Sequence, residues 1–292
     1  PYEVKELWDN TEGQKKALNI SSQRASLISR LFEELLEFLT QLSSFTRLPL
    51  DQVMAAAVGF RVDSYLTSMA REYREAIPER QERPYIPYAG GIVLEPERGL
   101  HEWVDVVDFR SMYPNVIVTF NLSPETLLAK GAKQSRSAVN VVPDLGYGFI
   151  KEPVGFFPRA LGALLKERTK IKEGLKKASG SQKRILLARE KVIKVITNAI
   201  YGYSGWLGSR WYSREMAEST TSYGRYLISK AIKMARDERL KIIYGDTDSI
   251  FLSHDEKKVK SLLQRIEREL GFDARLDKTY ERVLFTEAKK RY

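Results

Sequence analysis

Two aspartates lie two residues apart in the segment IIYGDTDSIFL, residues 242–252. Apolar residues flank a polar centre that contains Asp246 and Asp248, and this pattern predicts a β-hairpin with both carboxylates at its tip. Two negative charges so close together repel each other. The pair is therefore either a solvated turn or a site for a divalent cation, whose charge would reverse the repulsion.

A third acid follows another apolar segment. Residues 103–109 (WVDVVDF) are short and β-branched, which predicts a buried strand that ends near Asp108, followed by a tight turn containing Pro114. Taken alone, Asp108 is most often a cap or turn residue. The chain has no Cys and two His, which excludes a disulfide scaffold, a thiol nucleophile and a Cys-based zinc site. Any metal would be held by oxygen, which indicates magnesium, manganese or calcium.

Positive charge is concentrated in one part of the chain. The formal net charge is +10, and residues 166–194 contain 11 Lys and Arg against 3 Glu, a local excess of +8. The same region has two helical patterns, residues 161–177 and 182–201, joined by a polar turn. It therefore predicts an antiparallel helical pair. The charge favours a polyanionic partner.

One face of the second basic helix has a pattern that suits a nucleotide. Lys194, Asn198 and Tyr201 lie at i, i+4 and i+7, so they share a helical face. The cation could contact phosphate, and the ring could contact base or sugar. Arg168 and Lys172, at i and i+4 on the preceding helix, form a second cationic stripe. For each helix alone, an ordinary amphipathic or solvated charged face is the alternative.

Further helices are predicted around these elements. Helical patterns cover residues 22–45, 50–74, 213–240 and 257–270, and a mixed tail follows. Three prolines and a Gly-Gly pair in residues 77–91 indicate a linker. No apolar run approaches the roughly 18 residues that span a bilayer, and the first residues lack a signal-peptide pattern. Strands that carry acids, with a helical pair between them, indicate an α+β protein.

Five segments follow one another in a distinctive order. They are YAGG (residues 88–91), DFRSMYP (108–114), KVITNAIYGYSGW (194–206), YGDTDSI (244–250) and EAKKRY (287–292). In this order they closely resemble family B DNA polymerases of archaeal type. The second, third and fourth are similar to the family's motifs A, B and C. The first resembles the Tyr-Gly-Gly element between editing and polymerising regions, and the last resembles an element that touches the primer–template duplex.

The resemblance implies a polymerase palm with an antiparallel sheet, an inserted two-helix fingers hairpin and an N-terminal helical segment. Asp108 and Asp248, with Asp246 as a third acid, are expected to bind two magnesium ions, for which manganese can substitute. Tyr113 resembles the family's sugar gate, which excludes a ribose 2′-hydroxyl. The residues expected to bind the dNTP are Ser111, Met112, Tyr113, Arg168, Lys172, Lys194, Asn198 and Tyr201. Those expected to contact DNA are Tyr88, Gly90, Gly91, Gly202, Lys289, Lys290, Arg291 and Tyr292.

The resemblance also implies a division of the chain into five parts. They are the C-terminal edge of an exonuclease domain (1–45), a linker with the start of the polymerase region (46–104), palm with motif A (105–157), fingers (158–203) and palm with motif C (204–292). No Asp-x-Glu editing motif precedes motif A, and residues 20–24 align with the last editing motif without its Tyr and Asp. A thumb is expected to begin near Tyr292.

The implied activity is template-directed transfer of a deoxynucleoside monophosphate from dNTP to a primer 3′-hydroxyl, with release of pyrophosphate. The expected partners are primer–template DNA, dNTPs, a thumb-bearing polypeptide or further C-terminal segment, and a sliding clamp through regions outside this sequence. No membrane is expected, and the expected location is the cytoplasm, at the nucleoid. The alternative is an editing-deficient, non-catalytic DNA-binding or scaffold subunit. An unrelated calcium protein would require five accidental motif matches.

Overall fold

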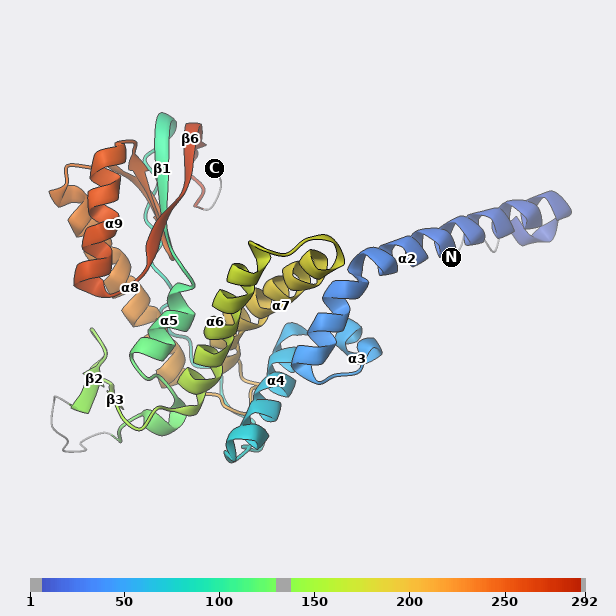
Figure 1. Ribbon diagram of the computed structural model, residues 1–292, viewed down its shortest axis with the longest axis horizontal. Helices are drawn as coiled ribbons and strands as arrows, with labels where there is room; N and C mark the ends of the chain where they lie inside the picture. The colour runs from blue at the N-terminus through green and yellow to red at the C-terminus, as the bar shows by residue number, and fades with distance from the viewer. Residues whose placement is uncertain (1–6, 130–137, 290–292) are drawn as a thin grey trace. The chain divides into compact units, whose positions relative to one another are not determined.

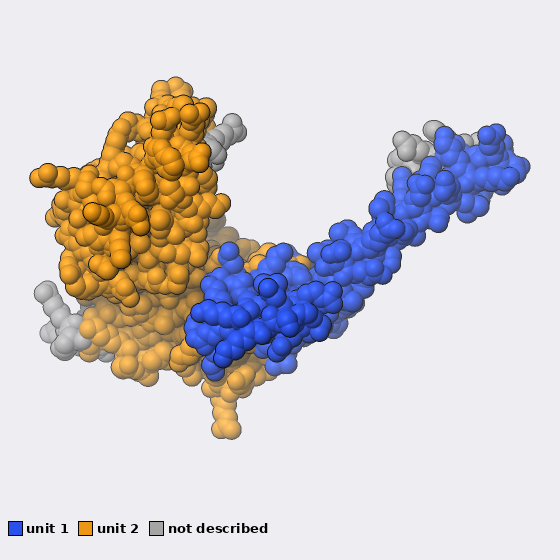
Figure 2. All heavy atoms as spheres, turned by 45° about the horizontal axis from the view of Figure 1, so that its top comes forward, with its two compact units in different colours: residues 1–57, 168–194 blue, residues 58–167, 195–292 orange. Residues whose placement is uncertain are grey.

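The computed structural model describes residues 7–129 and 138–289 (Figure 1). Lys290, Arg291 and Tyr292, which were expected to contact DNA, lie outside these residues. The chain divides into two compact units, which Figure 2 shows in different colours. Unit 1 consists of Pro1–Ala57 and Arg168–Lys194, and unit 2 of Val58–Glu167 and Val195–Tyr292. The two helices of the basic hairpin therefore contribute residues to both units.

Unit 2 contains a four-stranded antiparallel sheet (Figure 1). Its strands are β1 (Gly99–Phe109), β4 (Ile242–Asp246), β5 (Ser249–Ser253) and β6 (Ala274–Phe285), in the order β4–β5–β1–β6. The predicted strand, hairpin and α+β class are confirmed. Strand β6 was not predicted; it forms within the segment expected to be a mixed tail. Its residues Val283 and Phe285 are buried, while the polar residues between Ala274 and Tyr280 are exposed.

The sheet is packed with apolar side chains on both faces. One face has a core cluster formed by Val104, Val106, Ile243, Tyr244, Phe251, Val283 and Phe285. Alternate residues on the same strands, among them Val107, Ile250 and Leu252, are buried on the other face. The helices α8 (Arg214–Asp237) and α9 (Glu256–Leu270) contact the sheet. The strands that carry the acids are thus fixed by packing along most of their length.

The remaining elements of unit 2 include one further correction. They are α4 (Val58–Tyr73), α5 (Met112–Thr119), the 3-10 helix η2 (Pro124–Thr126), β2 (Val139–Val141), β3 (Gly148–Ile150) and parts of α6 (Phe156–Leu175) and α7 (Gly180–Ser204). A turn does follow the strand, at residues 110–111, but Pro114, which was expected in this turn, lies in helix α5. Pro114 is tolerated there because it lies in the first helical turn, where backbone N–H groups have no intrahelical acceptor.

A buried carboxylate joins α4 to the end of α7. Asp63 is 5% exposed. It accepts hydrogen bonds from Tyr203 Oη at 2.6 Å and from Arg210 Nε at 3.3 Å, and Arg80 forms an ion pair with it at 3.1 Å. The Tyr203 hydroxyl also accepts the backbone N–H of Arg210 at 3.1 Å. These bonds fix the C-terminal end of α7 against α4.

The buried Tyr203 phenol makes the free energy of unfolding fall at alkaline pH. Burial, with the hydrogen bond to Asp63, raises the pKa of Tyr203 to about 12. In the unfolded chain a phenol titrates near pH 10, so above about pH 10 the unfolded chain loses a proton that the folded chain keeps. The contribution of the protonated Tyr203 to the free energy of unfolding is complete below about pH 10. It is lost as the pH rises to about 12.

We therefore expect Tyr203→Phe to flatten the decline of the unfolding free energy in this window. The slope should become shallower by about 1.4 kcal/mol per pH unit. Urea denaturation of both proteins across the window measures the difference. Equal slopes in the two proteins would contradict the assignment of this titration to Tyr203.

Unit 1 is helical in the part that the structure describes. It contains the 3-10 helix η1 (Leu7–Asp9), α2 (Thr11–Thr46), α3 (Leu50–Ala55) and the remaining parts of α6 and α7. Helix α2 begins before the predicted residue 22, because Asn10 caps it by accepting the N–H of Gly13 at 2.7 Å. The cations of Arg189 and Lys191 on α7 lie over the rings of Phe45 and Phe38 on α2. Among the helices described, we find none with the length and apolar content needed to cross a bilayer.

Candidate active site

The backbones of the three predicted acids meet at one edge of the sheet. Asp108, near the end of β1, is opposite Ser249 of β5, and Ser249 is opposite Asp246 of β4. The N–H of Phe109 donates to the carbonyl of Asp248 at 2.9 Å. All three acids are half-buried. The structure thus brings together two acid-bearing segments that are about 140 residues apart in the sequence.

The turn between the two motif C acids has a strained backbone. Thr247 has a φ of 53°, in the left-handed region that β-branched residues rarely adopt. Its hydroxyl donates to Asp246 Oδ1 at 2.9 Å, and its N–H donates to the carbonyl of Ile92 at 2.8 Å. Ser111, three residues after Asp108, also has a positive φ of 46°. Each such residue costs about 1–3 kcal/mol and persists where its surroundings fix it, often at functional sites.

The oxygen donors at this edge suit a hard divalent cation. Carboxylates are the ligands that magnesium and manganese prefer. Within residues 7–129 and 138–289, no three Asp, Glu or His side chains come close enough to form a metal site by themselves. Magnesium usually binds through one or two carboxylates and keeps water or substrate phosphates as its other ligands. The donor set at this edge therefore fits magnesium without a complete protein cage.

Tyr113, the second residue of α5, lies beside these acids. Its ring centroid is 4.5 Å from that of Tyr201 on α7. Burial raises the pKa of Tyr113 to about 12, and the negative charge of Asp248 contributes to the rise. Burial also raises the pKa of Tyr201, and a hydrogen bond with Tyr88 adds to this rise. Three tyrosines predicted to bind DNA or dNTP, namely Tyr88, Tyr113 and Tyr201, therefore lie next to the aspartates expected to bind metal.

The segment 88–91 lies between α8 and the tip of the β4–β5 hairpin. Arg225 of α8 donates to the carbonyls of Ala89 at 3.0 Å and Gly90 at 2.7 Å, and Thr221 Oγ1 donates to Ala89 at 2.7 Å. Just after the segment, Val93 forms a β-bridge with Asp246. Neither Arg225 nor Thr221 was among the residues predicted from sequence. Their i, i+4 spacing on one helical face was the available signal.

The predicted dNTP residues are divided between the two units. Arg168, Lys172 and Lys194 belong to unit 1, whereas Asn198 and Tyr201 belong to unit 2. Neither unit by itself therefore contains the whole predicted set. Within unit 1, Arg168 Nε donates to Glu190 Oε1 at 2.8 Å, which joins α6 to α7. Lys172, Lys194, Asn198 and Gly202 are exposed on their helices.

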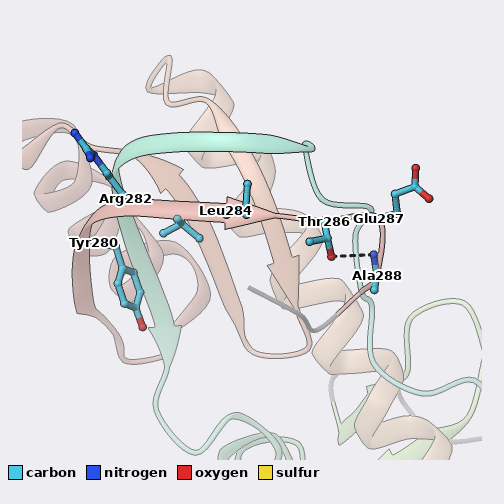
Figure 3. Close-up of a pocket in the computed structure, with 7 residues that line it drawn as sticks. Tyr280, Arg282, Leu284, Thr286, Glu287 and Ala288 are labelled. Atoms are coloured by element: carbon cyan, nitrogen blue, oxygen red, sulfur yellow. Dashed lines mark hydrogen bonds between the residues drawn. The ribbon is translucent and has the colours of Figure 1, made fainter.

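A pocket of about 830 Å³ lies along the C-terminal half of β6 (Figure 3). Its lining residues are Tyr280, Arg282, Val283, Leu284, Thr286, Glu287 and Ala288. None of the predicted metal or dNTP residues lines it. Lys289, which was expected to contact DNA, follows directly, and its ammonium lies 4.0 Å from Glu95. The pocket is thus separate from the candidate active site.

Comparison with known proteins identifies the family to which these motifs belong. Residues 48–292 match the family model described as DNA polymerase family B. The chain belongs to DNA polymerase family B. The predicted family is confirmed, and the alternative of an unrelated calcium protein is excluded. The roles of the individual residues stay predictions, as do the five parts into which the resemblance divides the chain.

Archaeal members of family B cover this chain almost completely. DNA polymerase 2 of Aeropyrum pernix is 43% identical over 293 residues, which are 100% of this chain and 36% of that protein. The DNA polymerase of Archaeoglobus fulgidus is 38% identical over 99% of this chain and 37% of its own length. The structure of the family B polymerase from Pyrobaculum calidifontis matches with a TM-score of 0.79 and 43% identity, over 98% of this chain and 38% of that one. The chain thus spans a little over a third of these family B relatives.

Proposed function

We propose that this family B chain is the catalytic core of a DNA-dependent DNA polymerase. It transfers a deoxynucleoside monophosphate from dNTP to the 3′-hydroxyl of a primer paired with a template, and pyrophosphate is released. One observation carries the proposal: the end of β1 at Asp108 is joined to the Asp246–Asp248 turn by the hydrogen bond between Phe109 N–H and the Asp248 carbonyl, 2.9 Å long.

The acids are proposed to hold two magnesium ions, or manganese in their place. Asp108 and Asp248 would hold these ions, with Asp246 as a third acid. When bound, such ions activate the primer hydroxyl and stabilise the charge that develops on the leaving pyrophosphate. The chain's own contribution is to hold the carboxylates in place, which the packed sheet and the strained Thr247 turn support.

The dNTP is proposed to bind through residues of the fingers hairpin and of the start of α5. Arg168, Lys172 and Lys194 bind phosphate oxygens through charge-assisted hydrogen bonds, and Asn198 adds an amide. At the start of α5, the backbone of Ser111 and Met112 offers N–H groups that have no intrahelical acceptor.

The tyrosines are proposed to contact the sugar and the base pair. Tyr113 lies beneath the sugar, where its ring excludes a 2′-hydroxyl. Tyr201 packs near the nascent base pair. The 4.5 Å separation of the two ring centroids supports a shared role in shaping this part of the site.

Duplex contacts are proposed for Tyr88, Gly90, Gly91, Gly202 and Lys289. Because the substrate is DNA, the proposed location of the activity is the nucleoid. We also propose a thumb-bearing polypeptide and a sliding clamp as partners. The chain's share of its relatives, 36% of the Aeropyrum pernix protein, supports the need for further polypeptide. Phosphate contacts supply most of the affinity for DNA. Without a thumb-bearing polypeptide, we therefore expect DNA binding that is weak and strongly dependent on salt.

Single-nucleotide extension tests this function. A labelled primer–template with one unpaired template base is mixed with the chain, a thumb-bearing polypeptide of a family B relative, magnesium and each dNTP in turn, at low salt. We expect extension by the complementary dNTP alone, with one pyrophosphate per nucleotide added. Changing the template base should change the dNTP that is used. DNA binding without any extension would favour the scaffold function instead.

A further inference from the structure

Tyr113 is enclosed by two glycines that come from different elements. A Cβ atom at Gly91 would lie 2.9 Å from Tyr113 Oη and 3.0 Å from Thr247 Cγ2. A Cβ atom at Gly224 of α8 would lie 2.8 Å from Tyr113 Cε1 and 3.1 Å from Met112 Cε. These distances are shorter than ordinary van der Waals contacts, which are about 3.5–4.0 Å between carbons. The phenol ring therefore occupies its present position because both residues lack a side chain.

Gly91 is held in place by hydrogen bonds on both sides. Before it, Arg225 donates to the carbonyls of Ala89 and Gly90 at 3.0 and 2.7 Å. After it, the carbonyl of Ile92 accepts the N–H of Thr247 at 2.8 Å. A charged donor makes the Arg225 bonds stronger than neutral ones, whereas a side chain can rotate within or near its rotamer well at small cost. The steric clash caused by a methyl group at Gly91 is therefore relieved by displacing the Tyr113 ring. The backbone of residues 89–92 stays in place.

We propose that Gly91, fixed by Arg225, is a positioning residue that determines where the Tyr113 ring lies beneath the incoming sugar, and so sets the selectivity for deoxyribose over ribose. Gly91 acts through Tyr113 and need not touch the nucleotide. This inference rests on the proposed function, in which Tyr113 excludes the 2′-hydroxyl. The hydrogen bonds from Arg225 make selectivity depend on a side chain of α8 that lies outside the three polymerase motifs.

The position of Tyr113 can be measured without catalysis. A 3-fluorotyrosine placed at position 113 of the whole chain gives one fluorine resonance, whose chemical shift reports the surroundings of the ring. We expect Gly91→Ala to move this resonance and Arg225→Met, which removes both hydrogen bonds, to move or broaden it. Gly162→Ala in α6 is the control, because a Cβ atom at Gly162 meets nothing within 4 Å and Gly162 has no proposed role in binding or catalysis; it should leave the resonance in place. An unchanged resonance in both Gly91→Ala and Arg225→Met would overturn the proposal whether or not the chain polymerises.

The effect on selectivity is measured in the single-nucleotide assay. The ratio of kcat/KM for a dNTP to kcat/KM for the matching rNTP should fall about tenfold in Gly91→Ala, the scale on which a pocket resolves one small group. It should fall in the same direction in Arg225→Met and stay unchanged in Gly162→Ala. If Gly91→Ala does not fold, Arg225→Met still tests the proposal.

A double-mutant cycle separates positioning from a general structural effect. Because Gly91 is proposed to act through Tyr113, Gly91→Ala should lower the ratio no further in a Tyr113→Ala background. An additive loss, or an unchanged ratio in an active enzyme, would overturn the inference and leave the proposed function standing. A wild-type chain that incorporates no nucleotide in the complete assay would overturn the proposed function, and the role in selectivity with it.

Discussion

Replacing Asp248 with Asn is expected to lower the rate of dNTP incorporation by about a thousandfold or more. Asn keeps the size of the side chain and removes its negative charge. Metal ions contribute several kcal/mol to stabilising a phosphoryl-transfer transition state, and each factor of ten in rate corresponds to about 1.4 kcal/mol. Single-turnover extension of a labelled primer, with a thumb-bearing polypeptide present, measures the loss. Asp108→Asn should have an effect of the same order.

The control for this charge change is Asp237→Asn. Asp237 is the last residue of α8, where it is exposed and forms an ion pair with Arg265 at 3.2 Å. This variant removes the same charge from a residue with no proposed role and should keep the wild-type rate. Crystals soaked in manganese provide a readout that does not depend on activity: anomalous density is expected between Asp108 and Asp248 in the wild type and not in Asp248→Asn. A peak elsewhere, or full activity in Asp248→Asn, would show that Asp108 and Asp248 are wrongly assigned as metal ligands.

Tyr113→Ala is expected to increase the incorporation of ribonucleotides relative to deoxyribonucleotides by about 10- to 200-fold. This range corresponds to the roughly 1–3 kcal/mol that one small group contributes to discrimination in a pocket. The ring is half-buried and lies between Gly91, Gly224 and Tyr201, so its removal opens space beneath the sugar. Incorporation of deoxyribonucleotides should survive, because the acids are unchanged. Competition between dNTP and rNTP on one template measures the ratio.

Tyr113→Phe is the matched variant for this prediction. It keeps the ring and removes only the hydroxyl group, so steric exclusion of the 2′-hydroxyl should remain close to that of the wild type. If Tyr113→Ala discriminates as well as the wild type, the ring does not contact the sugar. If Tyr113→Phe loses selectivity to the same extent as Tyr113→Ala, the hydroxyl group and not the ring carries the discrimination.

The elements with a strong local pattern were predictable from sequence. The apolar run before Asp108 and the hairpin around Asp246 and Asp248 form strands, and the basic hairpin forms two helices. Strand β6 was missed because only one of its faces is apolar over part of its length. Arg275, Asp277 and Lys278 are exposed and resemble a polar tail. The burial of Val283 and Phe285 depends on pairing with β1, which lies far away in the sequence, and on packing against β5.

The candidate site shows the same limit. Its motif residues were found because each lies in a recognisable local sequence. Arg225 was missed because its hydrogen bonds reach Ala89 and Gly90, residues 136 and 135 positions away. A close approach such as that of Gly91 to Tyr113 also leaves no local trace, since a glycine in a linker is ordinary. Helix α5 was missed because Pro114 usually indicates a turn, and only its place in the first helical turn makes it compatible with a helix.

The raised pKa values of Tyr113 and Tyr203, both about 12, bear on how this protein can be chemically modified. Reagents that iodinate or nitrate tyrosine attack the phenolate, and a pKa of 12 leaves about a hundredfold less phenolate near neutral pH than an ordinary phenol has. Tyr113 and Tyr203 are thus chemically protected by the folded chain. Tyr85, which is 75% exposed, is far more accessible to such reagents. Tyrosine-directed labels can therefore be attached to the surface while the ring beside the metal acids stays unmodified.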